Sequence, residues 1–177
     1  MRTFYIVILA LMMLFISACF PDQELVVRNN STADAWVRLN TGSERYVRPQ
    51  SSTSFSISSP QMANLQYHGR HILPGNILVD MEVTGSQYLS LEPNCGALRL
   101  HNASNLQIFS LRVTQAGNNN WSQNLLKDSL YPQEFDFFSL SPGYYDLKIQ
   151  DRQNNYYYIT AKQISIDSTT NHIFSGL

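Results

Sequence analysis

An internal repeat constrains this chain more than any other feature of its sequence. Three segments of the first half recur, in the same order, in the second half. They are residues 25–31 with 98–104, residues 48–50 with 131–133, and residues 55–58 with 138–141. The first pair is offset by 73 residues (98 − 25) and the other two by 83 (131 − 48), so the second copy holds about ten extra residues, for which 116–129 is the candidate insertion. Two copies are too few for a solenoid, and each copy must therefore close a core of its own.

Within each copy, apolar and polar residues alternate over short runs. These runs are residues 35–39, 108–113 and 146–150. Alternation with a period of two is typical of strands that bury one face. In the second run we expect Phe109, Leu111 and Val113 to form the buried face, with Ser110 and Arg112 pointing outward.

Clusters of Gly, Pro and Asn separate the runs, as required where a chain reverses direction. They lie at residues 41–43, 74–76, 84–86, 142–143 and 153–155. Beyond the N-terminal stretch, only residues 121–129 suggest helix, and then for a turn or two. The sequence therefore predicts an all-β chain of two small tandem β-sandwich-like domains, residues 25–96 and 97–177, divided near Gly96.

The N-terminus has the features of an export signal. A basic residue is followed by an unbroken apolar run over residues 4–15, shorter than the about 20 residues that a membrane span needs. Ile16-Ser17-Ala18-Cys19 follows directly. This motif resembles the lipobox of bacterial lipoproteins. The resemblance implies cleavage after Ala18, which removes residues 1–18 as a signal peptide, and attachment of lipid to Cys19.

The lipoprotein interpretation places the protein in the bacterial cell envelope, bound to a membrane through its N-terminal lipid. In enterobacterial lipoproteins, an Asp directly after the lipidated cysteine resembles an inner-membrane retention signal. This chain has Phe20 at that position, so we expect the protein to be anchored in the outer membrane, facing the periplasm or the surface. Residues 19–24 form the lipidated end and a tether. Five extended residues span at most about 18 Å, which places the first domain against the membrane. Two other interpretations are an ordinary signal peptide with a coincidental cysteine and a short uncleaved anchor.

Charge excludes one class of partner. Charged residues make up 14% of the chain, the net charge is −1, and the basic residues do not cluster. Nucleic-acid binding requires clustered Lys and Arg, so we expect no nucleic-acid partner. The chain also lacks a polybasic segment that would bind a membrane electrostatically.

Four short segments of the second half carry a further resemblance. They are residues 102–104 (NAS), 121–126 (WSQNLL), 131–133 (YPQ) and 145–147 (YDL). Together, over about residues 97–177, they resemble a recurring small β-domain of bacterial envelope proteins. That pattern usually has Gly after the Trp and after the Pro, where this chain has Ser122 and Gln133. The resemblance implies a fold and no reaction.

No catalytic motif is present in the sequence: it has no nucleophile elbow, HExxH, phosphate-binding glycine loop or CxxC. His68 and His71 have a spacing that suits a shared metal ion, but no third ligand is close in sequence, so a solvated loop is the simpler interpretation. Cys95 has no partner once Cys19 is lipidated, and we interpret it as a buried, inert thiol. The alternatives are an intermolecular disulfide and a reactive thiol. We expect no enzyme, no metal site and no cofactor.

Oxygen-bearing side chains near the last Gly/Asn cluster raise the question of calcium. Asp146, Asp151 and Asn154 offer ligands of the right type, but they lack the dense spacing of a calcium loop. A turn stabilised by Asp and Asn side chains explains them more simply. Both interpretations stay open at this point.

Tyrosines concentrate in two runs, residues 144–145 and 156–158. Because successive strand residues point to opposite faces, each run puts rings both into the core and toward solvent. Exposed aromatic side chains are good binding surface. The candidate binding residues are Tyr144, Tyr156, Tyr158 and Trp121. The alternatives are cross-strand aromatic pairing, cover for the domain junction and, for the tryptophan, a lid over the core.

The sequence thus favours a non-catalytic binding or structural module of the envelope, which binds a protein partner or an extended glycan. The alternative is an accessory subunit of a secretion or surface-polymer assembly. Glycan binding predicts a coplanar row of exposed rings, whereas partner binding predicts an apolar patch or an open edge strand. A hydrolase would require three converging residues among His, Asp and Ser in a concave pocket.

Overall fold

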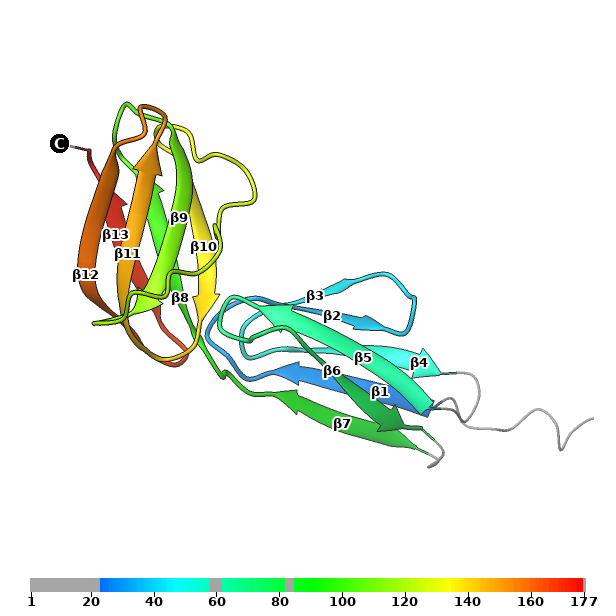
Figure 1. Ribbon diagram of the computed structural model, residues 1–177. Coiled ribbons are helices and arrows are strands. Elements are labelled where there is room, and N and C mark those ends of the chain that lie inside the picture. Colours follow the sequence, from blue (N-terminus) through cyan, green and yellow to red (C-terminus); the bar gives the residue numbers. More distant parts are fainter. Residues whose placement is uncertain (1–22, 58–61, 82–84, 177) are drawn as a thin grey trace, which may run out of the picture.

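The computed structural model describes residues 23–57, 62–81 and 85–176 and folds them into two β-sandwiches in tandem (Figure 1). The described part of the chain is all-β and contains no helix. Accordingly, it includes no helical segment of the length and apolarity that a bilayer crossing needs. The predicted signal peptide, its cleavage after Ala18 and the lipidated Cys19 lie outside the described residues.

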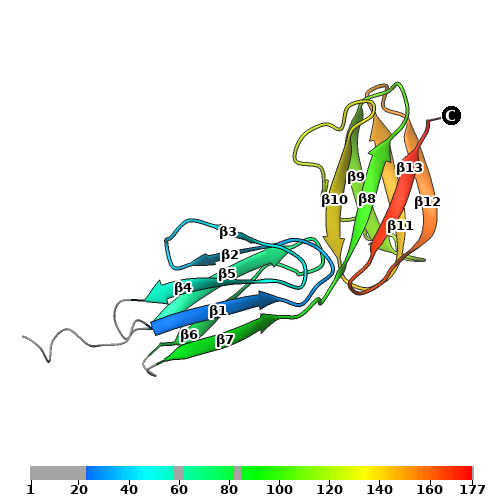
Figure 2. The ribbon, with the colours of Figure 1, turned by 180° about the vertical axis from the view of Figure 1, so that it is seen from behind.

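Two facing sheets form the first sandwich. Its strands are β1 (Gln23–Asn29), β2 (Ala35–Leu39), β3 (Arg45–Val47), β4 (Ser52–Ile57), β5 (Met62–Gly69), β6 (Gly75–Asp80) and β7 (Ser86–Leu91). One sheet has the order β4-β1-β7 and the other β3-β2-β5-β6. Neighbouring strands are antiparallel except β1 and β7, which run parallel (Figure 2).

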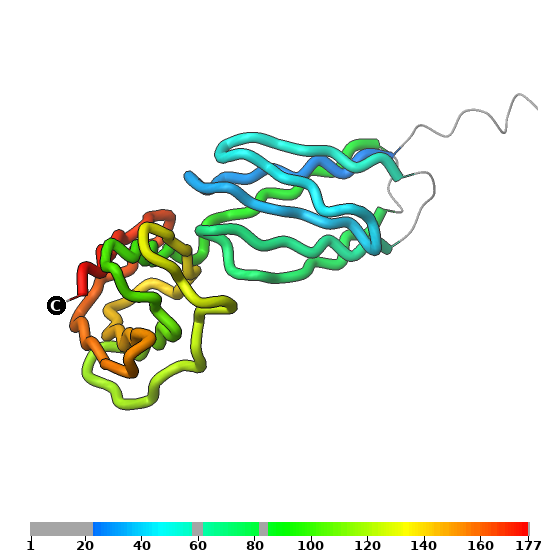
Figure 3. Tube along the Cα trace, turned by 90° about the horizontal axis from the view of Figure 1, so that it is seen from above, coloured from blue at the N-terminus to red at the C-terminus, as the bar shows by residue number. Residues whose placement is uncertain are grey.

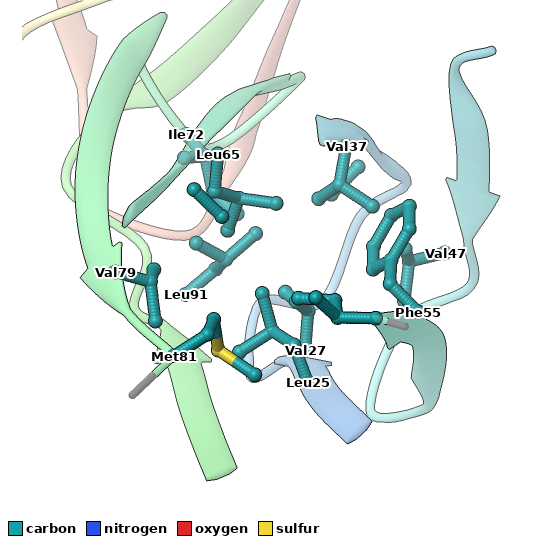
Figure 4. Close-up of a cluster of buried hydrophobic side chains, with 13 residues drawn as sticks. Leu25, Val27, Val37, Val47, Phe55, Leu65, Ile72, Val79, Met81 and Leu91 are labelled. Atoms are coloured by element: carbon teal, nitrogen blue, oxygen red, sulfur yellow. The ribbon is translucent and has the colours of Figure 1, made fainter. Parts of the chain in front are cut away.

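The core of the first sandwich lies between these sheets (Figure 4). Leu25 and Val27 of β1 face Val37 of β2 and Leu65 of β5, and all four side chains are fully buried. Burial of each such aliphatic side chain contributes about 2 kcal/mol to stability. The period-two alternation of the sequence is what supplies this one-sided apolar face.

The second sandwich has the same plan. Its strands are β8 (Gly96–Asn102), β9 (Ile108–Gln115), β10 (Phe135–Leu140), β11 (Gly143–Asp151), β12 (Tyr156–Ile164) and β13 (Thr169–Phe174). The sheet orders are β10-β8-β13 and β12-β11-β9, and only β8 and β13 run parallel. Figure 3 shows the two sandwiches as separate bodies that meet where the chain passes from β7 to β8.

Each sandwich corresponds to one copy of the sequence repeat. The strands β1 and β8 are the central strands of equivalent sheets, each with an antiparallel neighbour on one side and a parallel neighbour on the other. Leu25 lies opposite Phe55 in the first copy, and Leu98 lies opposite Phe138 in the second. The two repeated sequence segments are therefore paired in the same register in both domains.

The Asn-x-Ser motif at the end of β1 is buried and fully hydrogen-bonded. The Asn29 side-chain amide donates to the carbonyls of Ala33 at 2.8 Å and Val47 at 3.1 Å. Its Oδ1 accepts from the backbone amide of Ser31 at 3.0 Å and from the Ser31 hydroxyl at 2.7 Å. The side chain thereby ties the loop after β1 to the end of β3.

The second Asn-x-Ser motif repeats this network at the end of β8. The Asn102 amide donates to the carbonyls of Leu106 at 2.7 Å and Leu130 at 3.0 Å. Its Oδ1 accepts from the Ser104 amide at 3.1 Å and the Ser104 hydroxyl at 2.7 Å. The repeat thus preserves a polar motif of the core as well as the apolar pattern.

A Pro-Gln turn precedes β4 and β10. Both glutamines adopt positive φ, 54° at Gln50 and 69° at Gln133. The amide after each glutamine donates to the carbonyl of the residue before the proline, at 3.2 and 3.1 Å. This is a type II turn, in which the residue after Pro favours Gly.

Replacing Gln133 with glycine is expected to stabilise the second sandwich by about 1 kcal/mol, because glycine adopts positive φ without a Cβ penalty. The matched change Gln50→Gly is expected to stabilise the first sandwich less, because it removes side-chain hydrogen bonds. The Gln50 side-chain amide donates to the carbonyls of Asn30 at 2.6 Å and Ser31 at 3.3 Å. Denaturant midpoints of the two variants test this. Equal gains would show that the side-chain bonds of Gln50 contribute nothing.

The expected alternation in β9 is wrong at its start. Phe109 is 41% exposed, whereas Ser110 is buried. The register between β9 and β11 shifts where Asp151 lies opposite Ile108. This irregularity reverses the local alternation, so that Ile108, rather than Phe109, enters the core.

Candidate functional site

The outer face of sheet β12-β11-β9 gathers aromatic and basic side chains. Tyr156 and Tyr158 of β12 are 50% and 61% exposed. Lys148 of β11 lies beside them, with its Nζ 4.4 Å from the ring centroid of Tyr156 and 5.6 Å from that of Tyr158. Because a ring face attracts a cation, the tyrosines hold this ammonium group in place.

A second cation lies next to the first. Arg112 of β9 is directly opposite Lys148 across the β9–β11 pair. Like charges in this position repel, and among the described residues neither cation has a carboxylate within ion-pair distance. Asp146, two residues along β11, is engaged elsewhere: its oxygens accept from the backbone amides of Ala161 at 2.9 Å and Gly117 at 3.2 Å.

Trp121 reaches this face from a segment that runs beside β9. The amides of Ser122 and Leu125 donate to the carbonyls of Val113 and Leu111, both at 2.8 Å. The helical turn expected over residues 121–129 is therefore wrong. The segment is extended because it pairs with the free edge of β9, as β3 pairs with β2 in the first sandwich.

The Trp121 ring meets Tyr158 edge-on, with centroids 6.1 Å apart and ring planes at 63°. These rings thus do not form the coplanar row that a glycan platform predicts. Tyr144 is 56% exposed on β11, four residues before Lys148 and hence about 13 Å further along the strand. We call Trp121, Tyr156, Tyr158, Lys148 and Arg112 the tyrosine face.

The other two tyrosines of the runs at residues 144–145 and 156–158, Tyr145 and Tyr157, point inward, as the alternation predicts. Tyr145 is buried, which raises its pKa, and its hydroxyl donates to the Ser141 carbonyl at 3.0 Å. The Tyr157 ring packs edge-on against Phe174 at 4.8 Å. The parity argument therefore separates the exposed from the buried rings correctly. The same alternation over residues 146–150 places Lys148 on the exposed face, but it does not show that the side chain lies against two tyrosine rings.

Asp151 stabilises the turn between β11 and β12. Its fully buried carboxylate accepts from the amides of Gln153 and Asn155 at 2.8 and 3.0 Å, from the Asn155 side chain at 3.0 Å and from the Tyr157 hydroxyl at 2.9 Å. Burial acts to raise the pKa of Asp151, but these hydrogen bonds outweigh it and hold the pKa below its ordinary value. This set of donors is what the turn interpretation requires.

The depressed pKa of Asp151 predicts a pH dependence of stability. The folded state favours the ionised carboxylate, so its contribution is complete above the ordinary pKa of 3.8 and is lost as the pH falls toward the lower pKa of the folded state. We expect Asp151→Asn to be less stable at neutral pH and to lose part of the acid dependence. Denaturant midpoints at stepped pH test this, with exposed Asp128→Asn as the control. Parallel profiles of parent and Asp151→Asn would contradict it.

His68 and His71 do not converge on a metal. The His68 ring stacks on Trp36 at 5.4 Å, and its Nε2 lies 3.0 Å from Glu44. His71 is buried at the junction of the sandwiches, and the solvated loop expected for it is therefore wrong. Among the described residues, no three His, Cys, Asp or Glu side chains gather in a way that would hold a metal ion.

His71 connects the two sandwiches. Its Nδ1 lies 3.0 Å from the Asp167 carboxylate and its Nε2 3.0 Å from the Thr169 hydroxyl. Thr32 adds a backbone bond to the same carboxylate at 2.8 Å. This order of acid, imidazole and hydroxyl resembles a hydrolytic triad in connectivity, but the His71 side chain is only 5% exposed, so a substrate could not reach it. The network joins domains.

Cys95 lies in the same junction and is buried, as expected. Burial raises the pKa of its thiol, which lowers the fraction of reactive thiolate. Its Sγ lies 3.8 Å from the Arg70 carbonyl. The second sandwich contacts the first through β10, through Asp167 in the loop before β13 and through Thr169 at the start of β13. The exposed tyrosines lie on the opposite sheet and take no part in these contacts.

A shallow groove of about 400 Å³ lies on sheet β3-β2-β5-β6 of the first sandwich. Arg38, Glu44, Gln66, Tyr67, His68, Pro74, Gly75 and Asn76 line it. The Trp36 ring, stacked on His68 with ring planes at 10°, stands beside it. The combination of planar polar side chains and a neighbouring indole is one that suits sugars.

Comparison with known proteins gives a resemblance of fold only. No family model matches this sequence, and none of the curated proteins is similar to it. Among solved structures, a candidate cell adhesion protein from Bacteroides ovatus has 9% identity and a TM-score of 0.41, over 89% of this chain and 93% of that one. The minor pilin GBS52 of Streptococcus agalactiae has 9% identity and a TM-score of 0.33, over 86% and 94%.

The Bacillus anthracis TIE protein is similar at 12% identity and a TM-score of 0.33, over 88% of this chain. The match spans 34% of the length of that protein. At these identities and scores, the resemblances do not indicate what this chain binds.

Proposed function

We propose that this protein is a lipid-anchored, non-catalytic module of the bacterial envelope that docks an acidic surface of a partner protein on its tyrosine face. The single observation that supports this is the pair of adjacent cations, Lys148 and Arg112, set among exposed rings without a carboxylate partner in the described residues. A partner that supplies carboxylates would relieve their repulsion.

The composition of the tyrosine face supports a protein partner. Tyr, Trp and Arg are the residues most enriched at the energetic centres of protein interfaces. Tyr158 packs edge-on against Trp121, and Lys148 lies against both tyrosine rings, so less side-chain entropy is lost on binding than for isolated side chains. Complementary charge would steer the approach of an acidic partner and set its register.

The lipid anchor is a separate part of the proposal. It is supported by the Ile16-Ser17-Ala18-Cys19 motif after an apolar run. A tether that starts at Cys19 and meets β1 at Gln23 would keep the first sandwich at the membrane surface. The tyrosine face, on the second sandwich, would then project toward partners in the envelope.

Site-specific crosslinking of the full chain in its native membrane tests the docking surface. A photoreactive residue is placed at Tyr156, and as a control at Tyr88 of the first sandwich, which is 80% exposed. We expect one stoichiometric adduct from position 156 and none from 88. Lys148→Glu is expected to reduce the adduct at least about tenfold, because like charges across an interface cost several kcal/mol.

Lys127→Glu is the matched control for charge, since Lys127 is exposed in the same domain. If Lys148→Glu and Lys127→Glu reduce the crosslinked adduct equally, the effect comes from net charge alone, which would contradict a specific docking face. Cys19→Ser tests the anchor independently. If this variant is recovered with membranes as well as the parent is, the lipid anchor is refuted. The docking surface is tested separately, by the adduct at position 156.

Glycan binding is the second candidate, and the groove beside Trp36 is the observation that favours it. Binding of envelope polysaccharide to the parent, Tyr158→Ala and Trp36→Ala proteins tests this candidate. If the parent and Tyr158→Ala bind the polysaccharide and Trp36→Ala does not, the binding site lies on the first sandwich.

A further inference from the structure

Two arginines on a different face of the second sandwich are held by phenylalanine rings. On the outer face of sheet β10-β8-β13, the Arg99 guanidinium carbon lies 4.1 Å from the ring centroid of Phe135. The guanidinium carbon of Arg70, from the first sandwich, lies 3.9 Å from the ring centroid of Phe137. The two phenylalanine rings contact each other edge-on at 5.7 Å.

The position of Arg70 is fixed at both ends. Its backbone carbonyl accepts from the Ser139 hydroxyl at 3.0 Å, and the carbonyl of Gly69 accepts from the same hydroxyl at 3.1 Å. Ser139 lies on β10, two residues after Phe137, and so points to the same side of the sheet. The junction of the sandwiches therefore brings a cation of the first domain onto a ring of the second.

Stacking leaves the donors of these guanidinium groups available. A ring covers the flat face of a guanidinium, whereas the N–H groups point outward in its plane. No described carboxylate lies within ion-pair distance of Arg70 or Arg99. The neighbouring acids are otherwise bound, Asp34 by the Tyr46 hydroxyl at 2.6 Å and Asp167 by His71 at 3.0 Å.

The two arginines lie on neighbouring rings of one phenylalanine pair. Arg99 is directly opposite Phe137 across the β8–β10 pair, and Arg70 stacks on that same ring. His101, the next outward residue of β8, lies opposite Phe135. Two immobilised cations around one pair of rings repel each other unless an anion joins them.

We propose that Arg70 and Arg99 form an oxyanion site at the domain junction, which takes a carboxylate or phosphate group of a ligand. The guanidinium edges supply bidentate donors that match either group. Because one arginine comes from each sandwich, occupation of the site would also hold the two domains together. The site is independent of the tyrosine face, which lies on the other sheet.

Titration of the 15N-labelled full chain in maltoside micelles tests this proposal. Sodium phosphate and sodium acetate are added separately at constant ionic strength, with chloride as the compensating anion, and the Arg Nε–Hε signals are followed. We expect saturable shifts of the Arg70 and Arg99 signals. The stronger of the two probes identifies whether phosphate or carboxylate is the preferred chemistry.

Conservative variants test whether the geometry matters. Arg70→Lys and Arg99→Lys keep the charge but lose the planar fork, and each is expected to weaken binding about tenfold. Arg152→Lys, an exposed arginine of the same sandwich without a described ring contact, is expected to leave it unchanged. Ser139→Ala, which touches no ligand, is expected to weaken binding because it releases the Arg70 backbone. Shifts that do not saturate, or that are equal at Arg152, would overturn the proposal.

Discussion

Replacing Asn102 with alanine is expected to lower the free energy of unfolding of the second sandwich by about 4 kcal/mol. The buried Asn102 side chain accepts from two donors of Ser104 and donates to the carbonyls of Leu106 and Leu130. Alanine would remove these four hydrogen bonds, each worth about 1 kcal/mol, and would leave the Ser104 backbone amide without its partner in the core, which costs about 1–3 kcal/mol more. The carbonyls of Leu106 and Leu130 would each keep one donor, the Ser104 hydroxyl and the Ile108 amide. Local relaxation and entry of water keep the total below the sum of these costs.

The two tryptophans allow this loss to be measured, because Trp36 lies in the first sandwich and Trp121 in the second. In a Trp36→Phe background, fluorescence during chemical denaturation reports the second sandwich alone. The control is Asn105→Ala, which changes an exposed side chain and is expected to cost less than about 0.5 kcal/mol. A loss below about 1 kcal/mol for Asn102→Ala would refute a structural role of the motif.

Replacing Gly96 with alanine is expected to destabilise the second sandwich by about 3 kcal/mol. A Cβ at this position would lie 2.1 Å from the Ser165 carbonyl oxygen and 3.0 Å from that of Ser168. Both obstacles are backbone atoms of the loop before β13, and the amide of Ala97 donates to the Ser168 carbonyl at 2.9 Å. The substitution must therefore displace the loop that carries Asp167 to the domain junction.

Gly75→Ala is the matched control for this prediction. Its Cβ would meet the Tyr67 hydroxyl at 2.5 Å and the ring carbon Cζ at 2.6 Å, but this obstacle is a half-buried side chain and not backbone. We expect Gly75→Ala to destabilise the first sandwich by less than about 1 kcal/mol, read from Trp36 fluorescence during denaturation in a Trp121→Phe background. Equal losses of stability in Gly96→Ala and Gly75→Ala would contradict this prediction, because they would mean that the loop before β13 is displaced as easily as the Tyr67 side chain.

The fold was predictable from the sequence because the repeat and the alternation describe the same strands. The segments at residues 25–31 and 98–104 became the central strands β1 and β8, in equivalent registers with β4 and β10. The alternation fails only where pairing geometry intervenes, as at the register shift beside Ile108. Similarly, residues 121–126 are extended because the β9 edge offers hydrogen bonds that local propensity does not record.

The candidate sites were predictable only in part. Strand parity placed Tyr156 and Tyr158 on the solvent side, since that depends on neighbours along one strand. The environment of His71 depends on Asp167, which is 96 residues away, and no local pattern contains that contact. The pairing of Arg70 with Phe137 has the same origin, because it arises only when the two sandwiches meet.

The parallel pairing of β1 with β7 determines how the first sandwich responds to mechanical load. The six registered pairs run from Glu24 with Ser86 to Asn29 with Leu91, and β7 leads directly to the second sandwich. Tension between the N-terminal end of β1 and the C-terminal end of β7 pulls these strands past each other lengthwise. The bonds between them are then strained together, in shear, instead of opening one at a time like a zipper. A chain held at a membrane and pulled through its distal domain would meet its greatest resistance at this pair of strands.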